Sequence, residues 1–252
     1  MFAAMESGKA WFGFREVETS EKPQLVRDVF ERVASRYDLM NDLMSGGIHR
    51  WWKAALIDWL APKPGQLLLD VAGGTGDIAR GFLAKAGLDA RVVVCDLTPT
   101  MLAVGRDRSI DKGIVVGIDW VAGDALALPI AERSVDAYTI AFGLRNLADI
   151  DRALEEACRV LRPGGRFLCL EFSQVVLPLL KELYDLYSFR VVPWMGRIVT
   201  GERDSYVYLV ESIRRFPAQE ELRERLAAAG LVRASFRNLS GGIAALHSAW
   251  RI

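Results

Sequence analysis

A glycine-rich segment between an apolar run and a helical pattern constrains this chain more than any other feature. Residues 70–77 read Asp-Val-Ala-Gly-Gly-Thr-Gly-Asp; they follow the apolar run 67–69 and precede a helical pattern over 78–85. Glycines at a strand-to-helix turn let a ligand approach the backbone and meet the free N–H groups of the helix start. Because Asp70 ends the strand before the glycines, the turn favours a ligand with cationic and hydroxyl groups over one held mainly by phosphates.

Apolar runs and helical patterns alternate around this turn. The strand-like runs are 67–70, 91–96, 118–122, 135–141 and 166–172, and helical patterns lie near 78–85, 98–106 and 149–161. This alternation predicts an α/β fold with a doubly wound parallel sheet, whose ligand lies at the carboxyl ends of the strands. Two further runs, 232–239 and 242–250, meet at Ser240-Gly-Gly and predict a closing strand pair.

Two more acidic residues end or follow predicted strands at places suited to a nucleoside. Asp96 comes about 20 residues after the glycine turn, where a carboxylate can accept both ribose hydroxyls. Asp124 and Ala125 follow the third run, where a carboxylate and an adjacent N–H can read an adenine edge. With Asp70 placed to meet an ammonium group, these acids predict a site for S-adenosylmethionine. Each aspartate taken alone is equally compatible with a helix N-cap or a turn.

A nicotinamide dinucleotide is the competing ligand. Gly74 and Gly76, followed by Ala79, satisfy the G-x-G-x-x-G/A pattern of dinucleotide-binding turns. Both ligands require an acid such as Asp96, so that residue does not discriminate between them. Asp70 and Asp124 suit S-adenosylmethionine better, and we find no Tyr-x-x-x-Lys pair or comparable hydride-transfer signature. A non-catalytic scaffold is a third alternative.

Composition limits the class of protein. The 252 residues fit one domain with insertions, and 51% of them are hydrophobic, as in a globular α/β protein. Lys and Arg together number 32, as do Asp and Glu, so no overall positive field favours nucleic acid. No apolar stretch approaches the roughly 20 residues that cross a bilayer. The three cysteines lack metal-ligand spacing, so we predict no metal site and a cytoplasmic chain.

The single domain is expected to have four parts. Residues 61–173 form the cofactor-binding core, and 221–252 add a closing helix and the strand pair. Residues 1–60 read as an aromatic, helical N-terminal extension, and 174–220 as a helical insertion broken by prolines. We expect these two segments to cover the strand ends as a lid; the alternative is that they merely extend the core.

Long motifs occur in one register along the chain. Residues 30–45 read Phe-Glu-Arg-Val-Ala-Ser-Arg-Tyr-Asp-Leu-Met-Asn-Asp-Leu-Met-Ser, and residues 139–146 read Thr-Ile-Ala-Phe-Gly-Leu-Arg-Asn. With 47–50, 69–77, 170–173, 206–213 and 238–243, these motifs resemble the ubiquinone/menaquinone biosynthesis C-methyltransferase family. The resemblance runs from about Trp11 to His247.

The resemblance implies a class I methyltransferase with a Rossmann-like sheet and an antiparallel edge strand, methylating a ring carbon of a polyprenylated quinol. Carried over by motif, Thr75, Asp96 and the pair Asp124-Ala125 contact the cofactor. Ala141 stands where many relatives have a serine, so only a backbone contact is expected there. The Phe-Gly-Phe at 12–14 resembles ubiquinone-type members and favours a methoxy-polyprenyl-benzoquinol over demethylmenaquinol. A small-molecule O- or N-methyltransferase is the alternative within methyltransferases.

The candidates for the acceptor side of the reaction lie in two motifs. Arg145 cannot readily accept a proton, so we expect it to stabilise a phenolate or to orient a water molecule. Asn146 is placed to hold a quinol oxygen. His49, with Tyr37 and Asn41, is an alternative base cluster, although a histidine in such a helix is more often a packed residue.

The expected substrate also implies partners. A polyprenyl tail lies in the bilayer, so the resemblance implies peripheral contact with the inner membrane and a homodimer or a quinone-biosynthesis complex. Tyr206 and other aromatic residues of 177–216 are candidates for an apolar substrate tunnel, and equally for ordinary core packing. No basic amphipathic helix stands out as a membrane anchor.

Overall fold

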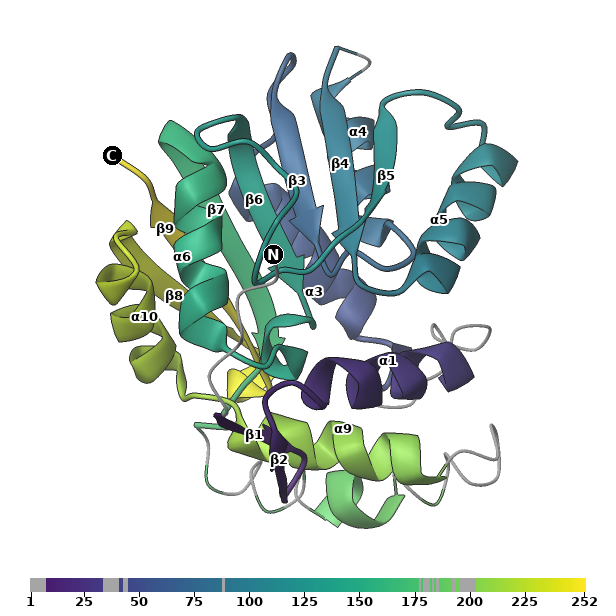
Figure 1. Ribbon diagram of the computed structural model, residues 1–252, viewed down its shortest axis with the longest axis vertical. Coiled ribbons are helices and arrows are strands. Elements are labelled where there is room, and N and C mark those ends of the chain that lie inside the picture. Colours follow the sequence, from purple (N-terminus) through teal and green to yellow (C-terminus); the bar gives the residue numbers. More distant parts are fainter. Residues whose placement is uncertain are drawn as a thin grey trace.

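The computed structural model describes residues 8–33, 41–42, 45–87, 89–176 and 203–252, together with 178, 182, 184, 186–191 and 194. Seven strands form one sheet in the order β5-β4-β3-β6-β7-β9-β8 (Figure 1). They are β3 (Leu67–Val71), β4 (Arg91–Asp96), β5 (Ile118–Ala122), β6 (Val135–Ala141), β7 (Leu161–Phe172), β8 (Val232–Leu239) and β9 (Ala244–Trp250). The parallel sheet expected from the alternating pattern is confirmed, because β3 to β7 pair in parallel.

The closing strand pair is antiparallel, as expected, but its order in the sheet is a finding. β9 runs antiparallel to both β7 and β8, so the antiparallel strand lies one place inside the edge and β8 is the edge strand. β7 also begins earlier than the predicted run 166–172. Leu161 pairs with Val135 and Arg166 with Ala137, so residues 162–165 bulge out of the ladder.

Helices cover both faces of the sheet. One face carries α3 (His49–Leu60), α4 (Asp77–Ala86) and α5 (Pro99–Asp111), and the other carries α6 (Ile150–Val160) and α10 (Gln219–Ala228). Asp149 caps α6 by accepting a hydrogen bond from the Arg152 N–H. There are also three short helical turns in the described residues. η2 (Leu144–Asn146) follows β6, η4 (Ser240–Gly242) precedes β9, and η3 (Tyr187–Val191) lies between β7 and α9. The fold is doubly wound.

A third layer, called the lid layer below, crosses the carboxyl ends of the parallel strands. It contains α1 (Lys22–Val33), α9 (Arg203–Arg215) and a hairpin of β1 (Lys9–Phe12) and β2 (Arg15–Glu18), all at the lower end in Figure 1. The expectation of helices for 1–60 did not include this hairpin. Gly13 supplies its turn at φ 62°, a left-handed conformation that glycine adopts without steric cost.

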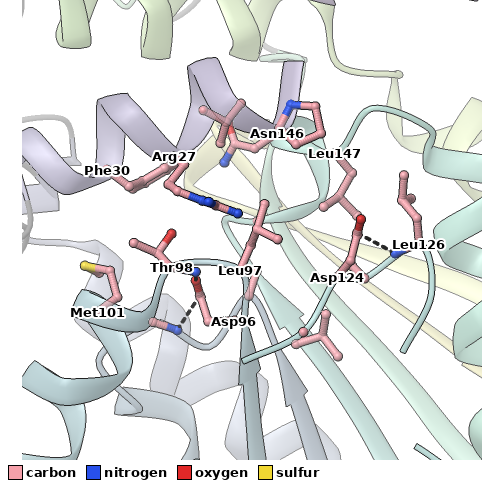
Figure 2. A pocket seen from close by; sticks show the side chains of 18 of the residues that line it. Arg27, Phe30, Asp96, Leu97, Thr98, Met101, Asp124, Leu126, Asn146 and Leu147 are labelled. Carbon is pink, nitrogen blue, oxygen red and sulfur yellow. Dashed lines mark hydrogen bonds between the residues drawn. The ribbon is translucent and has the colours of Figure 1, made fainter. Parts of the chain in front are cut away.

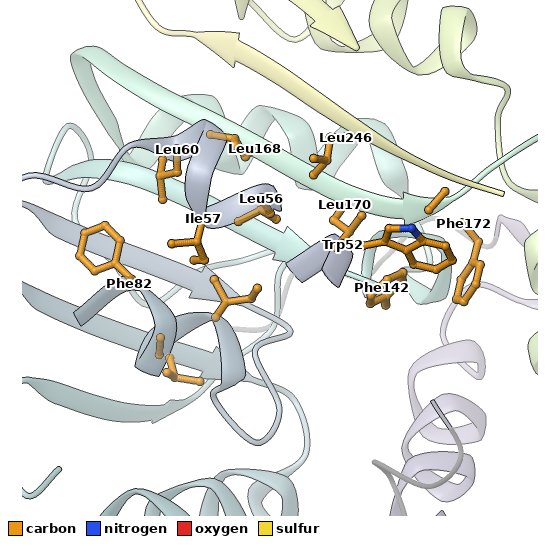
Figure 3. Close-up of a cluster of buried hydrophobic side chains, with 14 of the residues drawn as sticks. Trp52, Leu56, Ile57, Leu60, Phe82, Phe142, Leu168, Leu170, Phe172 and Leu246 are labelled. Atoms are coloured by element: carbon orange, nitrogen blue, oxygen red, sulfur yellow. The ribbon is translucent and has the colours of Figure 1, made fainter. Parts of the chain in front are cut away.

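An aromatic cluster lies in the core beneath the strand ends (Figure 3). The indole of Trp52 meets Phe172 edge-on at 5.9 Å between ring centroids and lies 6.3 Å from Phe142. Trp52 is fully buried, and its Nε1–H donates to Ser240 Oγ at 3.0 Å. The cluster therefore fixes α3, β7 and the turn after β6 against one another.

Among the described residues, no helix is long and apolar enough to cross a bilayer.

Candidate active site

A cavity of about 800 Å³, including its part open to solvent, lies at the carboxyl ends of the parallel strands. Asp96 and Asp124 line the side formed by the strand ends, with Met101 of α5 beside them, and Arg27 and Phe30 of α1 form the opposite wall (Figure 2). The place agrees with the ligand position expected for an open parallel sheet. Helix α1 of the lid layer thus covers the predicted cofactor site.

Asp96 shapes the glycine turn as well as the cavity wall. Its Oδ2 accepts the Gly74 N–H at 2.9 Å, and its Oδ1 accepts the Thr98 N–H at 2.8 Å. Burial raises the pKa of Asp96, while these two N–H groups oppose the rise. Gly76 has φ 76°, and a Cβ there would lie 2.6 Å from the Trp120 ring. The glycine turn can therefore carry no side chain at this position.

Asp124 and Ala125, the residues predicted to contact an adenine, also line this cavity. Asp124 Oδ1 accepts the Leu126 N–H at 2.9 Å, which fixes the carboxylate beside the cavity (Figure 2). Ala125 is buried in the wall. Asp96 and Asp124 therefore line one cavity from the ends of two different strands.

A second, smaller cavity of about 310 Å³ shares Ala72 with the first. Asp70, Thr75 and Ala141 line it, as does Lys53, which the sequence analysis did not single out. Lys53 lies on α3, outside the core motifs, so only the packing of α3 on α4 brings its ammonium here.

Asp70 is the most unusual group in the second cavity. Its side chain is 1% exposed; Oδ1 accepts the Thr139 hydroxyl at 2.8 Å, whereas Oδ2 has no hydrogen-bond partner among the described residues. Burial raises the pKa of Asp70 to about 7. A buried carboxylate oxygen without a partner is costly. This oxygen therefore suits a ligand that brings its own positive charge.

The neighbouring ion pairs give the second cavity both signs of charge. Lys53 Nζ lies 2.6 Å from Asp77 Oδ2, and Asp77 also pairs with Arg80. Burial alone would raise the pKa of Asp77, but the two cations bring it down to about 2. The ammonium of Lys53 thus faces an anion that stays charged at neutral pH.

The residues expected on the acceptor side form a hydrogen-bonded network after β6. Arg145 Nη1 donates to Glu171 Oε1 at 2.6 Å and to the Phe142 carbonyl at 2.7 Å, and Asn146 Nδ2 donates to the same carbonyl at 3.3 Å. Tyr208 of α9 donates its hydroxyl to Asn146 Oδ1 at 3.0 Å. Asn146 lines the first cavity, whereas Arg145 lines neither of these two cavities but a third one.

Glu171 and Phe142 were not singled out as site residues. Glu171 is 1% exposed and is the only acid in the apolar run 166–172, which is the signal that could have found it. Phe142 has φ 58°, a strained conformation for a bulky residue that nothing in the local sequence foretells.

The remaining candidates do not line the cofactor cavities. His49 is 3% exposed, with Nδ1 3.0 Å from Ser45 Oγ, and burial lowers its pKa. Asn41 is buried, and its carbonyl accepts the Ser45 hydroxyl. Tyr206 is fully buried in the hydrophobic cluster of Trp52. Tyr37 lies outside the described residues. The described part of the chain holds no group of three residues suited to a metal ion.

Comparison with known proteins agrees with this geometry. The ubiE/COQ5 methyltransferase family matches residues 17–251. The chain is 59% identical over 247 residues to the ubiquinone/menaquinone biosynthesis C-methyltransferase UbiE of Paracoccus denitrificans (strain Pd 1222), covering 98% of each. Its identity to the protein of that name from Brucella abortus (strain S19) is 55% over 243 residues, covering 96% of this chain and 90% of the relative.

A solved structure supports the fold class. An S-adenosylmethionine-dependent methyltransferase from Thermotoga maritima superposes with a TM-score of 0.61 at 18% identity, covering 90% of this chain and 100% of the other. The expected Rossmann-like methyltransferase fold is confirmed. The family match over residues 17–251 and the 59% identity to a curated relative show that this chain belongs to the ubiE/COQ5 methyltransferase family.

Proposed function

We propose that this chain transfers a methyl group from S-adenosylmethionine to a ring carbon of a polyprenylated benzoquinol, with demethylmenaquinol as a second acceptor. The observation that carries the proposal is a pair of neighbouring cavities that share Ala72. Asp96 and Asp124 line the first, and the second is lined by Asp70, whose Oδ2 has no hydrogen-bond partner among the described residues. Family membership supports the same chemistry. When bound, the cofactor supplies an electrophilic methyl group on a positively charged sulfur.

The residues of both cavities fit this cofactor. Asp96 would hold the ribose hydroxyls, and Asp124 with Ala125 would hold the adenine edge. Asp70 Oδ2, for which the described residues supply no partner, would accept a hydrogen bond from the α-ammonium of the methionyl end. Thr75 and the backbone of Ala141 line the same end. A dinucleotide with two phosphates would instead bring negative charge against Asp70.

Lys53 is the group in this chain best placed to meet the cofactor's carboxylate. Its ammonium borders the second cavity and already pairs with a carboxylate, Asp77, at 2.6 Å. We expect Lys53→Met to weaken binding of S-adenosylmethionine about tenfold, because a hydrogen bond to a charged group contributes about 1.5 kcal/mol or more. Decarboxylated S-adenosylmethionine lacks the carboxylate, so its affinity should be nearly the same for both proteins.

Calorimetric titration of both ligands into both proteins measures this difference. Lys85→Met is the matched control, because Lys85 pairs with Asp58 at the exposed surface of α4. Equal losses for the two ligands in the Lys53→Met protein would assign Lys53 to packing and not to the carboxylate.

On the acceptor side, this chain's residues bind and orient the quinol oxygen. Asn146 lines the larger cavity and can donate a hydrogen bond from Nδ2 to a quinol oxygen. Arg145, which precedes Asn146 in η2, is held by Glu171, and its guanidinium can favour the deprotonated quinol. Orientation of the acceptor and the methyl donor can contribute roughly 7–11 kcal/mol to lowering the barrier.

The decisive experiment uses labelled S-adenosylmethionine with demethylated benzoquinols and naphthoquinols of short and long prenyl chain. We expect methyl incorporation at a ring carbon, fastest with a long-chain methoxy-benzoquinol, as read by product mass and fragmentation. Methyl transfer to oxygen or nitrogen of small acceptors, with no quinol turnover, would overturn the proposal in favour of an O- or N-methyltransferase. Tight binding of a nicotinamide dinucleotide would favour the oxidoreductase.

We also propose peripheral contact with the inner membrane through the β1–β2 hairpin. Trp11 is 42% and Phe14 48% exposed, and the Arg215 guanidinium lies 3.5 Å from the centroid of the Trp11 ring. Exposed aromatic rings beside a cationic side chain suit an anionic lipid surface. Replacing both aromatics by Ser should abolish flotation with phosphatidylglycerol vesicles. The same replacement of Trp51, exposed on α3, is the control. Unchanged flotation of the hairpin variant would exclude this surface.

The homodimer or quinone-biosynthesis complex expected from the sequence stays a prediction. Sedimentation velocity of the purified chain, with and without vesicles, measures the self-association that a homodimer requires.

A further inference from the structure

The lid helix α9 reaches the acceptor side of the site through one hydroxyl group. Tyr208 lies on α9 and is 4% exposed, and its hydroxyl donates to Asn146 Oδ1 at 3.0 Å. Phe12 of the N-terminal hairpin stacks on the Tyr208 ring at 4.1 Å and 18°. The hydroxyl is therefore held in place by two elements of the lid layer, both far from Asn146 in sequence.

The contacts of Asn146 define which way its amide group points. A carbonyl oxygen can only accept, so the Phe142 carbonyl at 3.3 Å requires Asn146 Nδ2 on that side. That contact is long and is shared, because Arg145 Nη1 donates to the same carbonyl at 2.7 Å. The Tyr208 hydroxyl on Oδ1 makes the shorter of the two hydrogen bonds of the Asn146 side chain and fixes the opposite end of the amide.

We propose that Tyr208 is a positioning residue that fixes Asn146 as a hydrogen-bond donor toward the methyl acceptor. Nδ2 carries two protons, of which the Phe142 carbonyl takes one. The second is directed to the cavity that Asn146 lines, where the quinol oxygen gains negative charge during methyl transfer. The hydrogen bond from Tyr208 also polarises the amide and strengthens Nδ2–H as a donor. This inference rests on the proposed function.

Tyr208 itself takes no proton in this scheme. Burial raises the pKa of its hydroxyl well above the ordinary value, while the positive charge of Arg145 lowers it less strongly. Its proton is committed to Asn146 at neutral pH. An acceptor oxygen bound by Asn146 is therefore stabilised through the amide, and the lid contributes to turnover without touching the substrate.

A double-mutant cycle tests the inference. Tyr208→Phe should lower kcat about five- to tenfold and leave the affinity for S-adenosylmethionine unchanged, because one neutral hydrogen bond is lost. Asn146→Ala should lower kcat further, and adding Tyr208→Phe to it should cause no additional loss. Tyr138→Phe is the matched control, because Tyr138 is 1% exposed and stacks on Phe167 in the core.

A second measurement does not depend on turnover. In ¹⁵N spectra, the side-chain amide of Asn146, assigned by its loss in Asn146→Ala, should shift in Tyr208→Phe and in Phe12→Leu but not in Tyr138→Phe. Additive losses in the cycle, or an unmoved amide signal, would overturn the role of Tyr208. Absence of quinol methylation by the unaltered protein would instead overturn the proposed function, and the two failures are thereby distinguished.

Discussion

Replacing Asp70 by Asn is expected to weaken binding of S-adenosylmethionine roughly 30- to 150-fold at pH 7.5, since hydrogen bonds to charged groups contribute about 2–3 kcal/mol in such sites. The Asp70 carboxylate is buried, its Oδ2 has no hydrogen-bond partner in the described part of the chain, and the proposed ligand for that oxygen is an ammonium group. An amide at this position keeps the shape and removes the charge.

The pH dependence of the affinity follows from the same carboxyl group. Burial raises the pKa of Asp70 to about 7 in the protein without ligand. A cationic ligand favours the deprotonated form, so affinity should rise with pH up to about 7 and then level off. Above about 8 the ligand's own amino group loses its proton, and affinity should fall again. The Asp70→Asn protein should lack the rise below pH 7.

Calorimetric titration between pH 5.5 and 9 measures both effects. Asp119→Asn is the control, because Asp119 lies exposed on β5 in an ion pair with Arg91. A flat profile for the unaltered protein, or full affinity in Asp70→Asn, would contradict the assignment of Asp70 to the ammonium group.

Replacing Arg145 by Met is expected to destabilise the fold by about 3–5 kcal/mol, because it leaves the Glu171 carboxylate buried without its cation. The two side chains are 4% and 1% exposed and lie 2.6 Å apart. Arg91→Met breaks an exposed pair of similar distance and should cost less than about 1 kcal/mol. Urea-induced unfolding measures both values.

The sign of the pH dependence identifies Glu171 as the cause. Burial raises the pKa of Glu171, and Arg145 opposes that rise. Without Arg145 the pKa of Glu171 in the folded protein rises further above its value in the unfolded chain. Between these two pKa values the folded protein binds more protons than the unfolded chain. The stability of Arg145→Met should therefore fall as pH rises from the unfolded to the folded pKa of Glu171. Adding Glu171→Met should restore most of the stability, because an apolar pair replaces the ionic one.

The double variant also separates structure from catalysis at Arg145. If Arg145→Met/Glu171→Met is stable and still methylates at the normal rate, then Arg145 serves only to balance Glu171. If stability returns and turnover does not, the positive charge itself acts on the acceptor.

The cofactor half of the site was largely predictable from sequence. Asp70, Asp96 and Asp124 each end or follow a strand, and parallel strands bring their carboxyl ends to one edge. A local pattern thus suffices to place these residues together. His49 and Tyr206 had no such pattern, and the structure puts both in packed positions away from the cofactor cavities.

The acceptor half was not predictable in the same way. Glu171 and Tyr208 come from β7 and α9, and each acts through a partner far away in sequence. In the cofactor half, Lys53 of α3 escaped prediction for the same reason. Such contacts depend on how helices pack over the sheet, which a periodic pattern does not encode.

The sequence by itself determined the parallel sheet, the glycine turn with its acids, and the family, because these depend on residue spacing within single elements. Only the tertiary structure decided which charges share a cavity, that one oxygen of Asp70 finds no partner among the described residues, and that Tyr208 reaches Asn146. The physical reason is that burial and long-range pairing set the electrostatics of a site, and both arise only when separate elements pack together.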